Sequence, residues 1–352
     1  MNNTSDIRIS IIIPVFNAEK RLRLTLDAIL AQTLSDPFEL ILVNDGSQDA
    51  SPGICREYQA RNPGRITVLD GPNQGVSLAR NRGLDAARGE WIAFCDADDQ
   101  PEPGWLEKLL SQALKSHADL SCCAFLDVSP ETQSVRMNFA VTGPEELLDG
   151  AAEVRRRFLI PLFSGNPAVH GYLFASLFRR DIIERRLIRF TAGVSMKEDE
   201  LFYMDYLGQT ERIVASTVPL YRYIRSGEDS ATARHRKSAD PLRERNWLNY
   251  AGARLRIFRK YELEKSYPAL EKQLLLRYFV HRVQMVCSEP GTGFSGKRKA
   301  LRDIAQSAKK EDLRADGMSG RIFLAALLHF RFLLPLLCAV QRRQEKTRRP
   351  SS

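Results

Sequence analysis

Three short apolar runs decide how this chain folds: ISIIIPV at residues 9–15, FELILV at residues 38–43 and WIAFC at residues 91–95. Near-continuous Ile, Val and Leu in runs of this length are typical of strands buried on both faces, as in a parallel sheet. Residues 22–30 follow the first run and place apolar side chains on one face of a helix. Alternating strands and helices predict an α/β fold, with a mostly parallel, Rossmann-like sheet flanked by helices.

The same pattern continues to about residue 230, and a different one follows it. We expect further strands at 65–69, 120–126, 213–217 and 220–225, and helices at 76–87, 102–114, 145–163, 181–187 and 199–207. From residue 240 the pattern is helical, with long basic amphipathic segments. Because 352 residues exceed the usual size of one domain, we predict an α/β domain at 1–230 and a helical region at 231–352.

Charge is divided unevenly along the chain. Residues 1–150 contain 13 Lys and Arg against 22 Asp and Glu, whereas residues 151–352 contain 39 against 21. An acidic half is typical of a cation site or a catalytic carboxylate cluster, and a basic half of proteins that bind phosphates, nucleic acid or an anionic membrane surface. Six cysteines without a C-x-x-C spacing, and no signal-peptide pattern at the N-terminus, predict a reduced, cytoplasmic protein.

Polar clusters follow each of the three deciding runs, at residues 14–19, 44–47 and 96–99. In an open α/β sheet the ligand lies beyond the carboxyl ends of the strands, so these clusters should converge. In the last cluster, Asp-Ala-Asp-Asp, Asp96 and Asp98 point to one side of an extended chain and offer the hard oxygen ligands that Mg²⁺ or Mn²⁺ prefers. A solvated turn or a helix N-cap also collects aspartates, and the spacing alone leaves both interpretations open.

Together these motifs resemble the family 2 glycosyltransferases of the GT-A fold. They are SIIIPVFNAE at 10–19, VNDGS at 43–47, NQG at 73–75 with ARNRG at 79–83, and DADD at 96–99. The resemblance covers about residues 8–230. It implies a nucleotide-sugar donor, most simply a UDP-sugar, and a divalent metal, Mn²⁺ or Mg²⁺.

The resemblance also implies roles for individual residues. Asp45 would bond the base edge of the nucleotide, and Arg80 would approach the diphosphate or the donor sugar. Asp96 would contact the ribose or the metal, Asp98 would ligate the metal directly, and His235 is a further candidate ligand. The residues that would line the nucleotide pocket are Pro14, Phe16, Asn17, Glu19 and Gly75.

An acidic pair in the second part of the domain fits the family's Glu-Asp-x-x-Phe pattern, at residues 198–202. The resemblance makes Asp199 the catalytic base, with Glu198 as its rival. A sugar hydroxyl is a poor nucleophile, so a positioned carboxylate must remove its proton as it attacks the anomeric carbon. A single displacement of this kind inverts the anomeric centre. Helix capping is the alternative role for this pair.

The acceptor is less well defined by the sequence. Gly171–Arg180 resembles the family's acceptor-side segment, but Phe174 and Ser176 stand where a Trp and a Lys are common. The family resemblance implies a lipid-linked or polysaccharide acceptor in cell-surface glycan synthesis, and the basic second half is consistent with such an acceptor. Nucleic acid is not expected as a partner.

Residues 322–340 are apolar except for three positions, and five basic residues follow between 342 and 349. A segment of 19 residues is barely long enough to span a bilayer, and Arg331 and Pro335 oppose spanning. We therefore expect this segment either to lie on the cytoplasmic face of the membrane, with its tail on anionic headgroups, or to pack within the protein or against a second copy in a homodimer.

Two other functions use related features. A sugar-phosphate nucleotidyltransferase also needs a parallel sheet and carboxylate-bound Mg²⁺, but it should have a Gly-rich loop after the first strand, and residues 14–19 have none. A catalytically inactive protein on the same fold, binding an anionic surface, would explain the basic second half.

Overall fold

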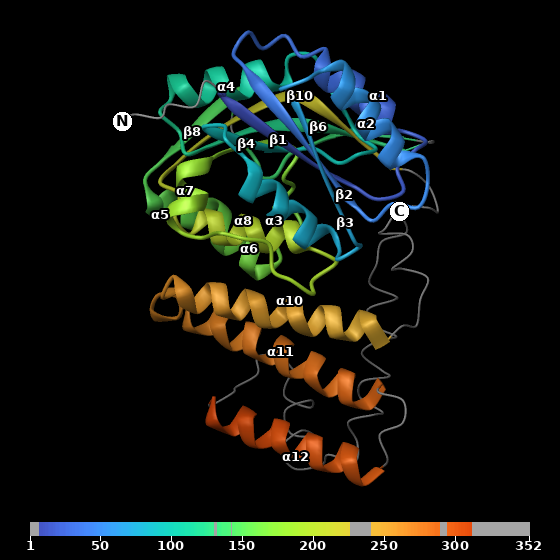
Figure 1. Cartoon of the computed structure of the whole chain (residues 1–352). Helices are drawn as coiled ribbons and strands as arrows, with labels where there is room; N and C mark the ends of the chain where they lie inside the picture. The colour runs from blue at the N-terminus through green and yellow to red at the C-terminus, as the bar shows by residue number, and fades with distance from the viewer. Residues whose placement is uncertain (1–6, 130–131, 142, 226–240, 289–293, 312–352) are drawn as a thin grey trace. The chain divides into compact units, whose positions relative to one another are not determined.

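The computed structural model describes residues 7–129, 132–141, 143–225, 241–288 and 294–311 (Figure 1). The chain divides into two compact units, Met1–Arg236 and Lys237–Ser352. The first contains a mixed sheet between helices, and the second contains the helices α10 (Pro241–Lys260), α11 (Pro268–Ser288) and α12 (Phe294–Lys310). The predicted fold class, an α/β domain followed by helices, is confirmed.

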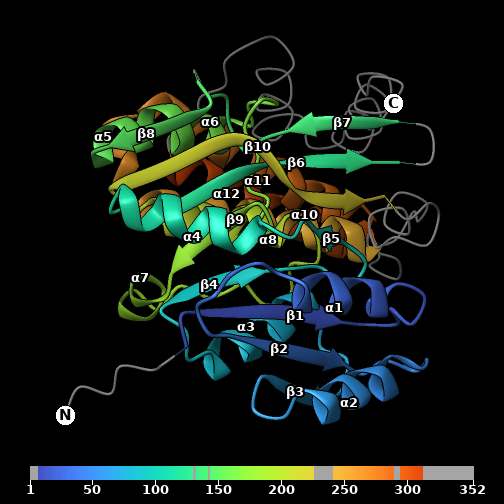
Figure 2. The ribbon, with the colours of Figure 1, turned by 90° about the horizontal axis from the view of Figure 1, so that it is seen from above.

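The described residues of the first unit form one ten-stranded sheet, in the order β3-β2-β1-β4-β9-β6-β10-β5, with β7 beside β6 and β8 beside β10 (Figure 2). Strands β1, β2, β3 and β4 are mutually parallel, as are β6 and β10; the pairings of β5, β7, β8 and β9 are antiparallel. The strands are β1 (Ile9–Val15), β2 (Phe38–Asp45), β3 (Ile66–Gly71), β4 (Trp91–Phe94), β5 (Gln100–Pro101), β6 (Leu120–Val128), β7 (Gln133–Arg136), β8 (Glu145–Asp149), β9 (Ser176–Arg179) and β10 (Arg212–Ile224).

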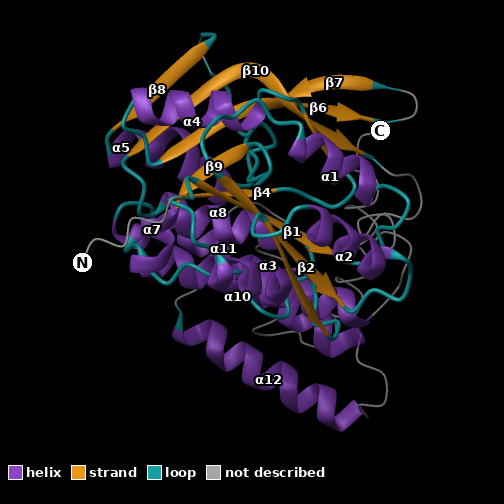
Figure 3. Ribbon diagram, turned by 45° about the horizontal axis from the view of Figure 1, so that its top comes forward, coloured by secondary structure: helices purple, strands orange, loops and turns teal. Residues whose placement is uncertain are grey.

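Helices cover both faces of this sheet (Figures 1 and 3). One face has α1 (Leu22–Leu30), α2 (Ser51–Arg61) and α4 (Trp105–Lys115); the other has α3 (Val76–Ala86), α6 (Ile160–Ser164), α7 (Arg180–Arg185) and α8 (Glu198–Leu207). Ile9, Ile11 and Ile13 join Leu26 of α1 in one buried cluster, because alternate residues of a strand share a face. Because helices cover both faces of the sheet, a central strand such as β1 needs apolar residues at successive positions, and the sequence of β1 has them.

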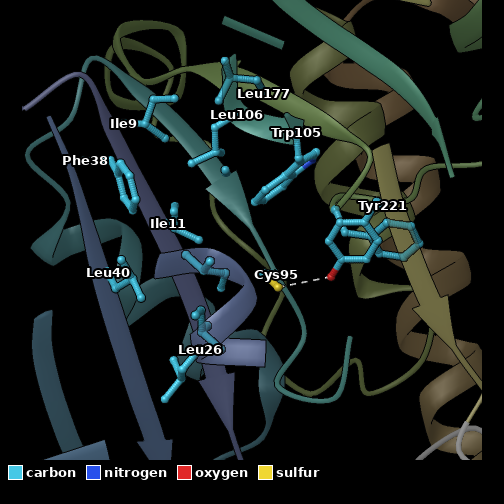
Figure 4. Packing of buried hydrophobic residues seen from close by; sticks show 14 of the residues in the cluster. Ile9, Ile11, Leu26, Phe38, Leu40, Cys95, Trp105, Leu106, Leu177 and Tyr221 are labelled. Carbon is cyan, nitrogen blue, oxygen red and sulfur yellow. Dashed lines mark hydrogen bonds between the residues drawn. The ribbon is translucent and has the colours of Figure 1, made fainter. Parts of the chain in front are cut away.

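Two close contacts hold helices against the two faces of the sheet. On one face, a methyl group added to Gly83 of α3 would overlap the side chain of Ile12 in β1, so α3 lies directly against this strand. On the other, Trp105 packs against Tyr221, and the Tyr221 hydroxyl lies 3.3 Å from the sulfur of Cys95 (Figure 4). The first contact lies at the middle of β1, and the second lies at the carboxyl end of β4, which Cys95 directly follows.

Two sequence-based expectations were wrong in detail. The helix expected over 145–163 begins only after Gly150, whose φ is 101°, because Glu145–Asp149 forms strand β8 and pairs with β10. It continues as α5 (Ala151–Val154), η1 (Arg155–Leu159) and α6. The two strands expected at 213–217 and 220–225 are one bulged strand, β10, whose register against β6 shifts on both sides of Pro219.

Within the described ranges, no helix is long and apolar enough to cross a bilayer. The apolar segment 322–340, the basic tail and His235 lie outside the described residues.

Candidate active site

The loops after β1 and β2 are bonded to each other at the carboxyl edge of the sheet. Asn17, with φ of 50°, accepts a hydrogen bond from the backbone of Gln48 at 2.8 Å, and its own N–H donates to Ser47 at 3.1 Å. The Glu19 carboxylate accepts from the backbone of Ala50 at 2.9 Å. Phe16, in the first of these loops, is 39% exposed. The predicted nucleotide-pocket residues of 14–19 therefore lie on a fixed edge next to the second loop.

Asp45 connects the second loop to a third. Its buried carboxylate accepts the backbone N–H groups of Gln74 at 2.8 Å and Gly75 at 2.9 Å. Gly75 has a φ of 91° and directly precedes α3, a conformation that glycine adopts without strain. Asp45 thus holds the turn that begins α3, and each carboxylate oxygen keeps a second lone pair for a ligand.

Arg80 of α3 joins two distant parts of the chain. It is only 6% exposed, and its two terminal nitrogens donate to Glu198 at 2.7 Å and to Asp96 at 3.0 Å. Its guanidinium also lies 5.4 Å from the ring centroid of Phe190. Burial alone would lower the pKa of Arg80, but the neighbouring carboxylates raise it above its ordinary value. The structure therefore brings the 96–99 loop and the 198–199 pair into one site.

The two candidate bases differ in their surroundings. Glu198 is buried and paired with Arg80, whereas Asp199 is half-buried and accepts the backbone N–H of Glu200 at 2.8 Å. Burial and the adjacent Glu198 raise the pKa of Asp199 to about 7, against the opposing influence of Arg80. A base is most effective when its pKa lies near the working pH. These surroundings favour Asp199 over Glu198 as proton acceptor.

Asp99 is a site residue that the sequence did not single out. It is fully buried, accepts the Tyr221 hydroxyl at 3.0 Å and accepts the backbone N–H of Ile224 at 2.8 Å. Burial and the charges of Asp96 and Asp98 raise the pKa of Asp99 well above its ordinary value. Asp99 therefore anchors the acidic loop to β10. The only sequence signal for a role of Asp99 was its place among three aspartates in four residues.

The acidic loop suits a hard divalent cation that is shared with a ligand. No group of three or more His, Cys, Asp or Glu side chains among the described residues could hold a metal ion by itself. Mg²⁺ and similar ions, however, are commonly bound by one or two carboxylates plus substrate phosphates. The backbone N–H of Asp99 donates to the carbonyl oxygen of Asp96 at 3.3 Å, so a tight turn keeps the three carboxylates of this loop in one small region. Carboxylate oxygens are the ligands that Mg²⁺ or Mn²⁺ prefers, so the loop has the donor set that the predicted metal needs.

Aromatic rings adjoin these acids. Phe174 is stacked on Tyr221 at 4.5 Å and on Tyr223 at 5.3 Å between ring centroids, and Tyr172 is stacked on Phe174 at 5.3 Å. Ser176 is buried and lies 2.6 Å from the Tyr203 hydroxyl. Phe174 and Ser176, the two positions at which this sequence departs from the acceptor-side pattern, therefore pack inside the protein. Tyr172 and Tyr223, which the sequence analysis did not select, are partly exposed.

Comparison with known proteins identifies the family. Residues 10–187 match Glycosyl transferase family 2. YibD of Escherichia coli (strain K12), an uncharacterized glycosyltransferase, is 30% identical across 77% of this chain and 79% of its own length. The chain belongs to glycosyl transferase family 2.

Two proteins of Bacillus subtilis (strain 168) are also similar to this chain. EpsJ of Bacillus subtilis (strain 168), an uncharacterized glycosyltransferase, is 29% identical across 87% of this chain and 86% of its own. The minor teichoic acid biosynthesis protein GgaA of the same organism is 30% identical across 68% of this chain and 50% of its own. The protein is thus similar to an uncharacterized glycosyltransferase over most of its length, and to a minor teichoic acid biosynthesis protein over a smaller part.

A solved structure confirms the fold. The structure of S. aureus TarS residues 1–349 in complex with UDP-GlcNAc superposes with a TM-score of 0.64 at 19% identity, covering 96% of this chain and 92% of that one. This confirms the predicted GT-A fold.

Proposed function

We propose that this family 2 glycosyltransferase transfers a sugar from a UDP-sugar to a hydroxyl of a lipid-linked or polysaccharide acceptor, with inversion at the anomeric carbon. The observation that supports this most strongly is the pairing of Arg80 with both Asp96 and Glu198. It unites the segment suited to the donor with the segment suited to the base. The UDP-GlcNAc complex of TarS and the role of GgaA in teichoic acid synthesis are consistent with this donor and acceptor class.

For donor binding, we propose that the first three loops hold the nucleoside. Asp45 would accept a hydrogen bond from the base through its remaining lone pairs, and the backbone that it fixes at Gly75 would approach the nucleotide. Asn17 and Glu19 keep the first loop in place through their bonds to the second. Pro14 and Phe16 supply the apolar edge of the same pocket.

For the diphosphate, we propose that Asp98 ligates Mn²⁺ or Mg²⁺ and that Asp96 contacts the metal or the ribose. Such an ion, when bound, neutralises the charge that develops on a departing diphosphate. Arg80 would act beside it, since two carboxylates already hold its guanidinium in place. His235 remains a candidate ligand from the sequence alone.

For the transfer, we propose Asp199 as the general base. The acceptor oxygen forms a bond to the anomeric carbon while the bond from that carbon to the diphosphate oxygen breaks. The hydroxyl proton passes to Asp199, and UDP leaves. Glu198 is less suited to this step because its carboxylate is engaged by Arg80 at 2.7 Å. One displacement on the face opposite the leaving group gives inversion.

For the organisation of the chain, we propose a catalytic domain over residues 1–230 and a helical region over 231–352. From the sequence we also propose that the protein works in the cytoplasm, with residues 322–340 and the basic tail on the inner face of the membrane. A homodimer would bury the same segment instead.

The experiment that tests this function measures UDP release from a panel of UDP-sugars, with Mn²⁺ and membrane extract as the acceptor source. We expect metal-dependent UDP release with one donor, and a product whose anomeric configuration, read by NMR, is opposite to that of the donor. No release from any donor would instead favour the inactive binding protein. Pyrophosphate release from UTP and a sugar 1-phosphate would favour the nucleotidyltransferase.

A further inference from the structure

A cationic pair lies next to the aromatic rings at the acceptor side of the site. Asp127 of β6 is 5% exposed and accepts two hydrogen bonds of 2.6 Å from the Arg225 guanidinium. Arg136 of β7 contacts the same carboxylate at 2.8 Å. One buried negative charge thus fixes two positive charges, and the group has a net charge of +1.

Both arginines are available to a ligand. The Arg136 side chain is 44% exposed and the Arg225 side chain is 46% exposed, although both contact the buried Asp127. A guanidinium has five N–H donors. Each of the two arginines uses only one or two of its donors to bind the Asp127 carboxylate. Side chains held in this way lose little further freedom on binding, and Arg donors match the geometry of a phosphate.

The pair adjoins Asp199 through the aromatic rings. Tyr223 is paired in register with Asp127, and its ring lies 6.4 Å from that of Tyr172. The Tyr172 ring lies 5.1 Å from that of Phe125, which is paired in register with Arg136. On the adjacent residue, a methyl group added to Gly171 would come within 3.0 Å of Glu200, the neighbour of Asp199. Burial raises the pKa of the Tyr172 hydroxyl, and the charges of Asp199, Arg136 and Arg225 also influence it. Tyr172 and Tyr223 are partly exposed, and an aromatic side chain offers apolar area together with a polar hydroxyl, which suits contact with a sugar.

We propose that Arg136 and Arg225 form a phosphate-binding subsite for the acceptor, which places a sugar on Tyr172 and Tyr223 with its hydroxyl at Asp199. The acceptor is then anionic, with a phosphate next to the sugar that is modified. This inference rests on the proposed transferase function and narrows its acceptor class. A phosphodiester repeat of a polymer and the diphosphate of a lipid-linked sugar share this chemistry.

Two phosphate-bearing probes separate these sources. One is a synthetic glycerol phosphate trimer, a phosphodiester, and the other is the octyl diphosphate ester of N-acetylglucosamine. Glycerol and octyl N-acetylglucosaminide are their uncharged counterparts. Titration calorimetry with UDP and Mn²⁺ present measures binding without turnover. We expect the protein to bind one phosphate-bearing probe at least about tenfold more tightly than its counterpart, as for a hydrogen bond to a charged group.

The variants Arg136→Gln and Arg225→Gln are made singly, so that Asp127 keeps one cationic partner. Each should reduce the preference for phosphate about tenfold, and Arg225→Lys, which keeps the charge, should restore part of it. The matched control is Arg212→Gln, because Arg212 pairs with Asp149 in the same bidentate way at the other end of β10. It should leave the preference unchanged.

The outcomes distinguish the inference from the function on which it rests. If the protein binds UDP and Mn²⁺ but prefers neither phosphate-bearing probe, or if both single variants keep the preference, the subsite is refuted and the transferase function stands. If it binds no UDP at all, the proposed function itself fails. Tighter binding of the trimer identifies a polymer repeat, and tighter binding of the octyl ester identifies a lipid-linked acceptor.

Discussion

Arg80 and Glu198 are separated by 118 residues in the sequence, and in the folded chain their side chains meet at 2.7 Å, both largely buried. Asp96 completes the contact from a third segment, at 3.0 Å. Removing one partner of a buried ion pair leaves an uncompensated charge, which costs far more than an exposed pair contributes. One guanidinium therefore bridges the acidic pair and the acidic loop.

Arg80→Ala should destabilise the protein by about 3–5 kcal/mol, since Glu198 would remain buried without its partner. Urea unfolding followed by circular dichroism measures the change. The control is Arg23→Ala, because Arg23 forms a bidentate but exposed pair with Glu57, and loss of an exposed pair should change the free energy of unfolding little. Equal losses in the two variants would contradict the structural role given to Arg80.

Asp199→Asn should lower the transfer rate by roughly 10²–10⁴-fold, the usual contribution of a general base, while binding of the UDP-sugar stays near that of the unchanged protein. Steady-state transfer and titration calorimetry measure the two properties. Glu198→Gln is the comparison: because it disturbs the partner of Arg80, it should weaken donor binding as well as transfer. Near-normal transfer by Asp199→Asn would exclude this residue as the base.

The raised pKa of Asp199, about 7, predicts opposite effects of pH on rate and stability. Transfer should rise as the pH increases through about 7, because only the ionised carboxylate accepts a proton. Folding stability should fall as the pH rises from about 4, the ordinary pKa of an aspartate, to about 7, because the folded state holds this proton more tightly than the unfolded state. Asp199→Asn should remove this part of the pH dependence in thermal unfolding; an unchanged profile would contradict the assigned pKa shift.

Gly83→Ala tests the contact between α3 and β1. The added methyl group would overlap Ile12, so a loss of about 1–3 kcal/mol is expected from overpacking. In the control Gly53→Ala, on α2, no atom lies within 4 Å of the new methyl group, and a gain of roughly 0.5–1 kcal/mol is expected from helix propensity. Chemical unfolding measures both, and a tolerated Gly83→Ala would show that α3 does not need to lie this close.

The parts of this structure that were predictable from the sequence are those fixed by local pattern. Strand β1 and helix α3 follow from apolar periodicity, and the polar residues at strand ends follow from the topology of parallel sheets. Strand β8 was expected to be helical because Glu145–Asp149 has no alternating pattern of its own. It is a strand only because β10 offers it an antiparallel partner.

In the site, too, some residues could be predicted from local pattern and others could not. Asp96, Asp98 and Asp199 could be selected by motif, but the bond between Arg80 and Glu198 joins segments with no sequence relationship. The burial of Asp99 and the position of Arg136 beside Arg225 also depend on which strands are neighbours. The role of such residues depends on pairing between distant segments, so the sequence around each residue did not predict it.

The most direct test of the central claim is titration calorimetry of a UDP-sugar with and without Mn²⁺, using the unchanged protein, Asp98→Asn and Asp199→Asn. The account predicts metal-dependent binding by the unchanged protein and by Asp199→Asn, and none by Asp98→Asn. Binding that is equally tight in all three proteins after metal chelation would show that the acidic loop at residues 96–99 does not hold a metal-bound nucleotide, and the account would be wrong.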